Sequence, residues 1–166
     1  MGKFPEGFIW GAATAGHQVE GDNINSDTWF AEHVTPTIFK EPSGKACNSY
    51  VLWREDIDLA KGLNFNAYRF SIEWARIQPA EGEFDEKELA HYEAMIDYCI
   101  EIGLEPIVTL NHFTSPHWFA KLSSWTNPRS AELFATYVTK VMQRYGSKLK
   151  RVVTLNEPNL PPLLSW

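Results

Sequence analysis

The chain has 166 residues, a formal net charge of −6 and 44% hydrophobic residues, enough for one globular domain with its own core. The acidic balance gives no reason to expect nucleic acid or an anionic membrane surface as a partner, and no segment approaches the length of a membrane span. Residues 1–6 lack the apolar run of a signal peptide, so a cytoplasmic protein is the default expectation. Cys47 and Cys99 belong to no metal or redox motif, and we expect no metal and no cofactor.

The first predicted strand covers residues 8–13, which are apolar and end in small residues, and residues 14–21 form the loop beyond it. Residues 22–46 show no regular pattern and predict a long surface excursion. Asn48 is the expected N-cap of the next helix. Its inward positions recur at helical spacing: Tyr50, Trp53, Ile57, Ala60 and Leu63.

The second strand is predicted at residues 67–72, followed by a loop at 79–82. Asp85 with Glu88 three residues later predicts a helix N-terminus of the capping-box type, in which each side chain caps the other residue's backbone N–H. Gly103 is expected to end this helix. The inward face is predicted to carry Leu89, Tyr92, Met95, Ile96, Cys99 and Ile100.

The third strand is predicted at residues 106–110, and residues 115–125 read as another long loop. A further helix is expected from about Ser130 to Gly146, followed by a fourth strand at residues 151–156. The inward positions of this helix are Phe134, Tyr137, Val138, Val141 and Tyr145.

Short strands that are apolar on both faces, separated by amphipathic helices, predict a parallel sheet buried between layers. The pattern alone does not separate an open doubly wound sheet from a barrel. Polar residues where successive strands end favour the (β/α)₈ barrel, whose catalytic groups come from strand ends. No Gly-rich phosphate-binding fingerprint occurs, so a dehydrogenase is a weaker interpretation. The polar residues are Gln18, Arg69, Ser71, His112, Asn156 and Glu157.

The fourth strand ends abruptly in Asn156, Glu157 and Pro158. Pro158 favours an extended conformation at Glu157. A carboxyl group at a strand end against an apolar interior has its pKa raised by desolvation, which suits a general acid. This segment alone leaves a second interpretation open, a glutamate that meets only solvent or a structural arginine.

These strand-end blocks, in this order, resemble glycoside hydrolase family 1, the β-glucosidase and β-galactosidase group. The resemblance implies an α/β fold, a (β/α)₈ barrel of which this chain supplies roughly the first four β/α units, and a retaining exo-β-glycosidase. The matching blocks are residues 8–15 with Gln18, Glu20 and Gly21; 55–57; 67–72 with Trp74, Arg76, Ile77 and Pro79; 108–110 with His112, Phe113 and Pro116; Trp125 with Asn127; and 154–158.

The resemblance also implies roles for five residues. Glu157 resembles the general acid that protonates the glycosidic oxygen and then serves as the base that activates water. Asn156 resembles the residue that binds the sugar 2-hydroxyl, and Gln18 and His112 resemble contacts to hydroxyls on the far side of the glycone. Arg69 resembles the guanidinium that keeps the nucleophile ionised. The alternative is that these residues have only structural roles: Arg69 would pair with a buried acid, and His112 would make its hydrogen bonds within the core or a loop.

The chain departs from the family pattern at three places. Thr114 stands where the family usually has aspartate, and Ser123 and Ser124 stand where glycines are common. These changes bear on substrate identity more than on reaction type. Asn64 replaces a usual glycine, a change that asparagine tolerates because it accepts a left-handed backbone conformation.

A retaining glycosidase uses two carboxyl groups about 5–5.5 Å apart. The family's nucleophile lies in a Thr-Glu-Asn-Gly stretch at the seventh strand, and residues 1–166 contain no such stretch. We therefore expect these residues to form the N-terminal half of a single (β/α)₈ catalytic domain, inactive alone. Unpaired sheet edges predict association with a complementary C-terminal half-barrel, self-association or poor solubility.

Two alternative functions stay open at this point. One is another clan-related (β/α)₈ glycoside hydrolase, such as an endo-cellulase that shares the Asn-Glu ending of the fourth strand. The other is a non-catalytic half-barrel that serves in assembly or binds sugar. The residues that would select glucose, galactose or another glycone are expected largely on later loops of the family's barrel.

Overall fold

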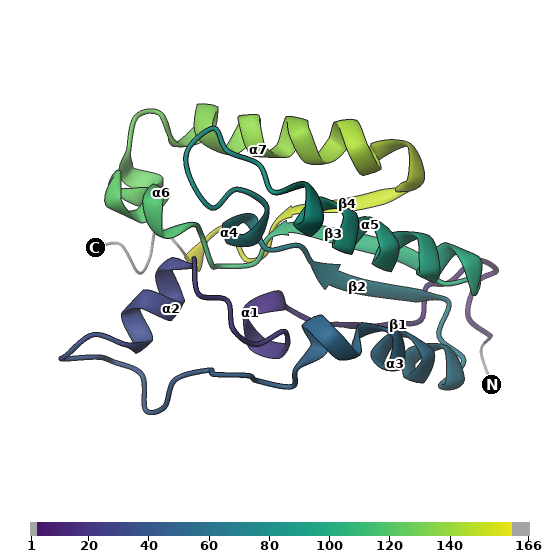
Figure 1. Ribbon diagram of the computed structural model, residues 1–166. Helices are drawn as coiled ribbons and strands as arrows, with labels where there is room; N and C mark the ends of the chain where they lie inside the picture. Colours follow the sequence, from purple (N-terminus) through teal and green to yellow (C-terminus); the bar gives the residue numbers. More distant parts are fainter. Residues whose placement is uncertain (1–2, 161–166) are drawn as a thin grey trace.

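Four parallel strands form one sheet in which their spatial order follows their order in the chain. The computed structural model describes residues 3–160 (Figure 1). The parallel pairs need crossover connections, and each crossover in this chain carries helices. The strands are β1 (Gly11–Ala13), β2 (Ala67–Ser71), β3 (Glu105–Asn111) and β4 (Arg151–Leu155).

Three long helices run beside the sheet, and α5 (Glu86–Glu101) packs between α3 (Ser49–Gly62) and α7 (Ser130–Tyr145) (Figure 1). The core lies between these helices and the sheet. Burial of large apolar side chains from both layers is what holds the helices on the strands. Fully buried members include Ile57, Tyr92, Ile96, Val108, Leu110, Tyr137, Val141 and Tyr145.

The expectation that every strand is buried on both faces is wrong for the two outer strands. All three residues of β1 are exposed, and β4 has two exposed and three half-buried residues and none that is buried. The reason is their place in the sheet, since within residues 3–160 each pairs with a single neighbour. The inner strands β2 and β3 are mostly buried, as predicted.

The first strand is shorter than predicted, beginning at Gly11 and not at residue 8. Before it, the Asn66 side chain accepts from the Trp10 N–H over 2.8 Å and donates to the Phe8 carbonyl, while the backbone N–H groups of Asn66 and Ala67 donate to the Trp10 carbonyl. Phe4, Phe8 and Trp10 instead form a cluster with ring centroids 4.6 to 4.8 Å apart.

Four short helices were not predicted from the sequence: three occupy predicted loops, and the one at Trp74–Ile77 lies between the predicted second strand and the loop at 79–82, where no element was assigned. Helices of four to six residues are too short to show a 3.6-residue period, so pattern analysis misses them. The 22–46 segment is also not purely a surface excursion, because Asn23 and Ser26 are buried. The short helices are α1 (Gly16–Val19), α2 (Asp27–Glu32), α4 (Trp74–Ile77) and α6 (His117–Lys121), with 3₁₀ turns η1 (Ser124–Thr126) and η2 (Gly146–Lys148).

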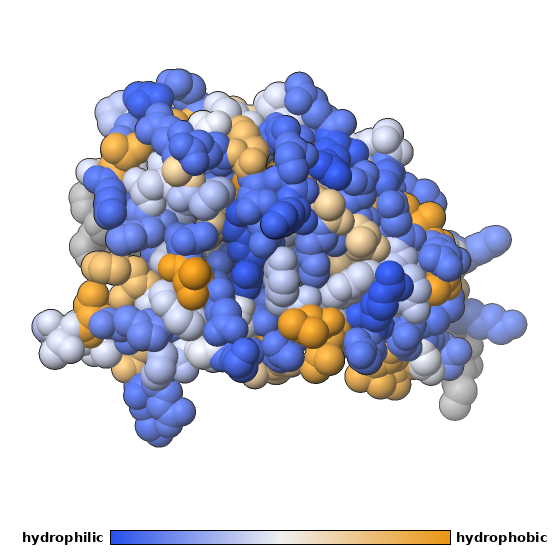
Figure 2. Space-filling view, in the orientation of Figure 1, coloured by the Kyte–Doolittle hydropathy of each residue, from blue (hydrophilic) through white to orange (hydrophobic). Residues whose placement is uncertain are grey.

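Most predicted inward positions of the long helices are buried, and two are exposed. Four more are half-buried, namely Tyr50, Trp53, Phe134 and Val138. Leu63 is 60% exposed because α3 has ended at Gly62, and Ile100 is 47% exposed at the edge of the inward face of α5. Apolar side chains also reach the surface on α3, where Figure 2 shows orange patches; they belong to Val51, Leu52 and Leu59. Within residues 3–160, no helix combines the length and the apolar character required to cross a membrane.

The predicted N-caps are at the right positions but differ in chemistry. Asp85 caps α5 as predicted, with its carboxylate accepting from the backbone N–H groups of Lys87 and Glu88. Glu88 does not return the bond, because its carboxylate accepts from the Tyr50 hydroxyl. Asn48 precedes α3 in a left-handed conformation and makes no side-chain capping bond.

Candidate functional site

Four of the five predicted site residues follow strands of the sheet, and the fifth lies within one. Gln18 lies on α1 beyond β1, Arg69 lies in β2, His112 follows β3, and Asn156 and Glu157 follow β4. Because the strands are parallel, their carboxyl ends all lie at the same end of the sheet, called the carboxyl edge below. The active sites of (β/α)₈ barrels lie at this end of the strands.

The Arg69 side chain ties three strands together. Its Nε donates to the Thr109 Oγ1 on β3 over 2.8 Å, and its Nη2 donates to the Asn156 Oδ1 over 2.6 Å. The Asn156 backbone N–H in turn donates to the Asn111 carbonyl over 2.9 Å, which extends the β3–β4 pairing by one residue. Asn156 is therefore fixed by both its main chain and its side chain.

His112 lies half-buried at the end of β3, and its Nδ1 is buried without a hydrogen-bond partner among residues 3–160. Burial and the positive charge of Arg69 lower the pKa of His112, while the Glu157 carboxylate acts in the opposite direction. These three charged or ionisable groups thus share one electrostatic neighbourhood. The backbone turns sharply after His112, with Phe113 at a φ of 69° and the Thr114 N–H donating to the His112 carbonyl.

Glu157 corrects two expectations. Its φ is 47°, a left-handed conformation, and not the extended one predicted from Pro158. The Leu160 N–H donates to its carbonyl over 3.0 Å, so the chain turns immediately after β4. Glu157 is also exposed, so the apolar enclosure predicted for its carboxyl group is not present within residues 3–160.

Gln18 is exposed on α1, and its side chain makes no hydrogen bond to the other four residues in the described part of the chain. Its backbone N–H donates to the Ala15 carbonyl, which places it in the first turn beyond β1. The structure therefore brings Arg69 and Asn156 into contact and places His112 and Glu157 near them. Gln18 shares only their edge of the sheet.

Sequence reasoning missed two buried carboxylates behind this edge. Glu20 accepts from the Arg76 Nε over 2.9 Å and from the Tyr92 hydroxyl, and burial together with the nearby Glu73 raises the pKa of Glu20 to about 8. Glu73 directly follows the apolar end of β2, between Ile72 and Trp74. An acidic residue inside such an apolar run indicates a buried carboxylate that has polar partners, because burying a carboxylate without partners costs much free energy.

The three backbone departures from the family pattern have a common geometry. Asn64, Ser123 and Ser124 all adopt positive φ values, of 61°, 71° and 50°. Glycine adopts this region without a steric cost, whereas a residue with a Cβ is strained there. The left-handed conformation predicted for Asn64 is thus confirmed.

A hollow of about 440 Å³ lies at the opposite edge of the sheet, where β3 and β4 begin. It is lined by Gly103, Glu105, Lys148, Lys150 and Arg151, among others. That edge of a (β/α)₈ barrel contributes to stability and does not carry the chemistry. Within residues 3–160, no group of histidine, cysteine and acidic side chains is arranged to hold a metal ion.

Comparison with known proteins gives consistent matches over nearly the whole chain. The sequence model of Glycosyl hydrolase family 1 matches residues 1–166. Beta-glucosidase A of Thermotoga maritima is 39% identical over 163 residues, covering 94% of this chain and 36% of that protein. The cytosolic beta-glucosidase of Homo sapiens is 36% identical over 172 residues, covering 98% of this chain and 37% of that protein.

A solved structure agrees equally well. The crystal structure of beta-glycosidase BGL167 matches with a TM-score of 0.94 and 54% sequence identity, over 97% of this chain and 39% of that chain. The present chain thus spans between 36% and 39% of the length of these relatives.

Proposed function

Because the chain belongs to glycosyl hydrolase family 1, we propose that it contributes to a retaining exo-β-glycosidase of the β-glucosidase type. Its parallel strands and helices are the first four β/α units of the family's (β/α)₈ barrel, the architecture that BGL167 shares with it. In this proposal, residues 1–166 form the N-terminal half of one catalytic domain.

The proposed reaction runs in two steps through Glu157 and a second carboxylate, which the family resemblance assigns to a stretch outside these 166 residues. In the first step the second carboxylate attacks the anomeric carbon, the glycosidic C–O bond breaks, and Glu157 gives its proton to the departing oxygen. In the second step water attacks the same carbon, Glu157 takes a proton from that water, and the bond between the carbon and the second carboxylate breaks. The sugar leaves with its β configuration, and both carboxyl groups return to their starting states.

The observation that carries the proposal is the hydrogen bond between Arg69 and Asn156. It uses the amide oxygen of Asn156 and leaves the NH₂ group to face a ligand beside Glu157, as a contact to a sugar 2-hydroxyl requires. The unpartnered Nδ1 of His112 supports a second hydroxyl contact, since an orphan buried nitrogen gains when a ligand supplies its hydrogen bond. Gln18 completes the proposed glycone contacts.

The proposed substrate is a β-glucoside, in line with the named activity of the relative from Thermotoga maritima. A cytoplasmic location is supported by the cytosolic relative from Homo sapiens. The proposed protein partner is a complementary C-terminal half-barrel, or else a second copy of this chain. Either would cover β1 and β4, whose outer edges have no pairing partner within residues 3–160.

A chimera tests this function directly. The matched N-terminal part of BGL167 is replaced by this chain, and hydrolysis of an aryl β-glucoside is measured together with the configuration of the first-formed sugar. We expect turnover with retention, and a Glu157→Gln variant whose kcat is lower by about 10²–10⁴-fold. The 166-residue chain alone is expected to show no turnover, because only one of the two carboxylates is present.

Glu105→Gln serves as the matched control, since Glu105 lies at the opposite end of the sheet and should leave turnover unchanged. A folded chimera whose activity survives Glu157→Gln would refute the assignment of the acid. Binding of glucose without any turnover would instead favour a sugar-binding module.

A further inference from the structure

Glu73 is a buried carboxylate that lies directly behind the candidate site. It is the N-terminal neighbour of α4, follows β2, and is 1% exposed. Its Oε2 accepts from the Asn23 Nδ2 and from the Thr114 Oγ1, each over 2.7 Å, and its Oε1 lies 3.4 Å from the Ser71 hydroxyl. A carboxylate so deeply buried is tolerated only because these donors satisfy it.

The two strongest donors to Glu73 come from two different loops, and each loop carries a proposed sugar contact. Asn23 follows α1, the helix of Gln18. Thr114 closes the turn that begins at His112, where its N–H donates to the His112 carbonyl and its own carbonyl accepts from Asn111. One carboxylate at the end of β2 therefore joins the loops that follow β1 and β3.

The α1 loop is also fitted to Glu73 by shape. Gly16 opens α1 and donates its N–H to the Ser71 hydroxyl over 2.6 Å. A Cβ at position 16 would lie 2.5 Å from the Glu73 Oε1 and 2.9 Å from its Cδ. The carboxylate thus fills the space that a side chain on Gly16 would need, and it packs on the backbone two residues before Gln18.

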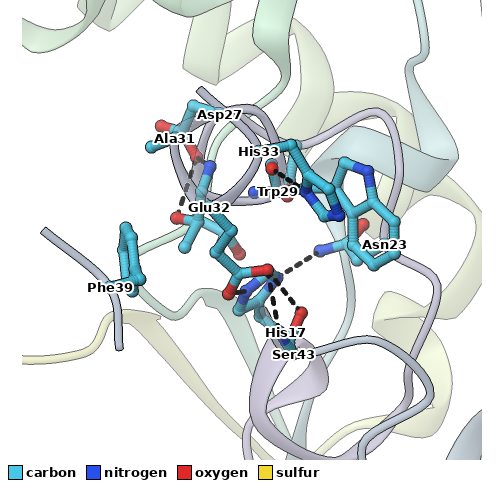
Figure 3. Close-up of polar contacts among 12 residues, drawn as sticks. His17, Asn23, Asp27, Trp29, Ala31, Glu32, His33, Phe39 and Ser43 are labelled. Atoms are coloured by element: carbon cyan, nitrogen blue, oxygen red, sulfur yellow. Dashed lines mark hydrogen bonds and ion pairs between the residues drawn. The ribbon is translucent and has the colours of Figure 1, made fainter. Parts of the chain in front are cut away.

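Asn23 links Glu73 to further polar side chains of the same loop. Its Nδ2 lies 3.4 Å from the His17 Nδ1, and the His17 Nε2 donates to the Glu32 Oε1 over 3.0 Å. Figure 3 shows Glu32 reaching from α2 to His17 and to Ser43, whose N–H and hydroxyl both donate to it. The anchor at Glu73 is therefore continuous with the polar contacts that hold residues 17–43 in place.

We propose that Glu73 is a positioning residue for glycone binding, whose carboxylate fixes the α1 helix of Gln18 relative to the turn of His112. This rests on the proposed function for the sugar contacts themselves. The position of Thr114 fits the proposal, because the family resemblance places an aspartate there. In this chain the acid reaches the same point from the end of β2, and threonine supplies the matching donor.

The proposal predicts that the acid can be moved between the two positions. Thr114→Asp alone should destabilise the protein, because it sets a second carboxylate against Glu73 in a buried place. In a Glu73→Ala background the same substitution should restore what Glu73→Ala loses. A residue needed only for packing would give no such rescue.

The test uses the 166-residue chain and its ¹H–¹⁵N NMR spectrum, which does not depend on activity. Glu73→Ala should shift or broaden the signals of Gln18 and His112, and Glu73→Ala with Thr114→Asp should return them toward their original positions. Tyr145→Phe removes another buried hydrogen bond, to the Leu89 carbonyl, and should leave both signals in place. Glu73→Gln gives a milder variant should Glu73→Ala fail to fold.

The same substitutions in the BGL167 chimera should raise the inhibition constant for glucose by on the order of tenfold to hundredfold, with the rescue again in the double variant. Unchanged Gln18 and His112 signals in folded Glu73→Ala, or the absence of rescue, would overturn the proposal. An inactive chimera would count against the proposed function alone, since the NMR comparison still decides the role of Glu73.

Discussion

Arg69 on β2 and Asn156 beyond β4 are 87 residues apart in sequence, and their side chains meet at a hydrogen-bond distance of 2.6 Å. The strand between them, β3, contributes Thr109 to the same guanidinium. A flat fork of N–H donors suits this task, because it holds two acceptors in fixed directions. The carboxyl edge of the sheet is thus cross-linked by side chains as well as by the backbone ladder.

This contact predicts energetic coupling between the two residues. In a double-mutant cycle with Arg69→Ala and Asn156→Ala, the free energies of unfolding should deviate from additivity by about 1–2 kcal/mol, since either single change removes the same charge-assisted bond. Urea unfolding of the parent, the two single variants and the double variant measures the deviation.

The control cycle combines Arg69→Ala with Asp85→Ala, two residues that share no partner, and should be additive within about 0.5 kcal/mol. Additivity of Arg69→Ala with Asn156→Ala as well would show that the bond is absent in solution. Arg69→Lys should behave largely like Arg69→Ala in the cycle, because lysine lacks the fork that reaches two acceptors.

His91 on α5 predicts a loss of stability in acid. Burial, followed by the charge of Arg76, lowers the pKa of His91 from 6.5 to about 4, and its Nε2 is buried without a partner among residues 3–160. The ring stacks on Tyr50 with centroids 4.1 Å apart. The folded protein disfavours the protonated ring, so the contribution of His91 is complete above pH 6.5 and is lost as the pH falls toward 4.

The measurement compares the unfolding free energy of the parent and of His91→Phe from pH 4 to pH 7.5, roughly the span over which histidine titrates. The phenylalanine keeps the stack and has no proton to gain, so the difference between the two proteins should grow in its favour as the pH falls. Taking this difference also cancels the titration of Glu20, which acts in the opposite sense.

The left-handed residue after α6 predicts a stabilising substitution. Ser123 follows the C-cap Leu122 with a φ of 71°, the position where helices commonly end in glycine. Ser123→Gly should stabilise the protein by up to about 1 kcal/mol, the steric cost of the conformation less the added freedom of the unfolded chain. Thermal unfolding measures the gain, and Asn64→Gly should gain less because asparagine tolerates this region better.

The sequence predicted those helices and strands that have a regular apolar pattern or a recognisable residue at their ends. The strands at β2, β3 and β4 and the helices α3, α5 and α7 were expected within a few residues of their observed bounds. Short apolar runs, 3.6-residue spacing and a capping residue such as Asp85 are local signals, so they can be recognised without knowledge of the tertiary fold.

The remaining features depend on contacts that sequence does not display. Glu157 adopts a left-handed conformation against the local preference set by Pro158, at the start of a turn that the Leu160 N–H closes on the Glu157 carbonyl. The role of Glu73 arises only when Asn23 and Thr114 arrive from two other loops. From the sequence, Gly16 is indistinguishable from any other loop glycine. Only the structure shows that the Glu73 carboxylate occupies the space that a side chain at position 16 would fill.

The start of α5 gives the last prediction, because the capping there is one-sided. Asp85 accepts from the N–H groups of Lys87 and Glu88, whereas the Asp85 N–H donates to the Ile77 carbonyl and the Glu88 carboxylate accepts from Tyr50. Asp85→Ala should therefore destabilise the protein by about 1 kcal/mol, with Asp85→Ser recovering most of the loss. A true capping box would couple Asp85 with Glu88. We expect instead that the effects of Asp85→Ala and Glu88→Gln on the free energy of unfolding in urea are additive, whereas those of Glu88→Gln and Tyr50→Phe are coupled. Coupling between Asp85 and Glu88, together with additivity between Glu88 and Tyr50, would contradict the structure.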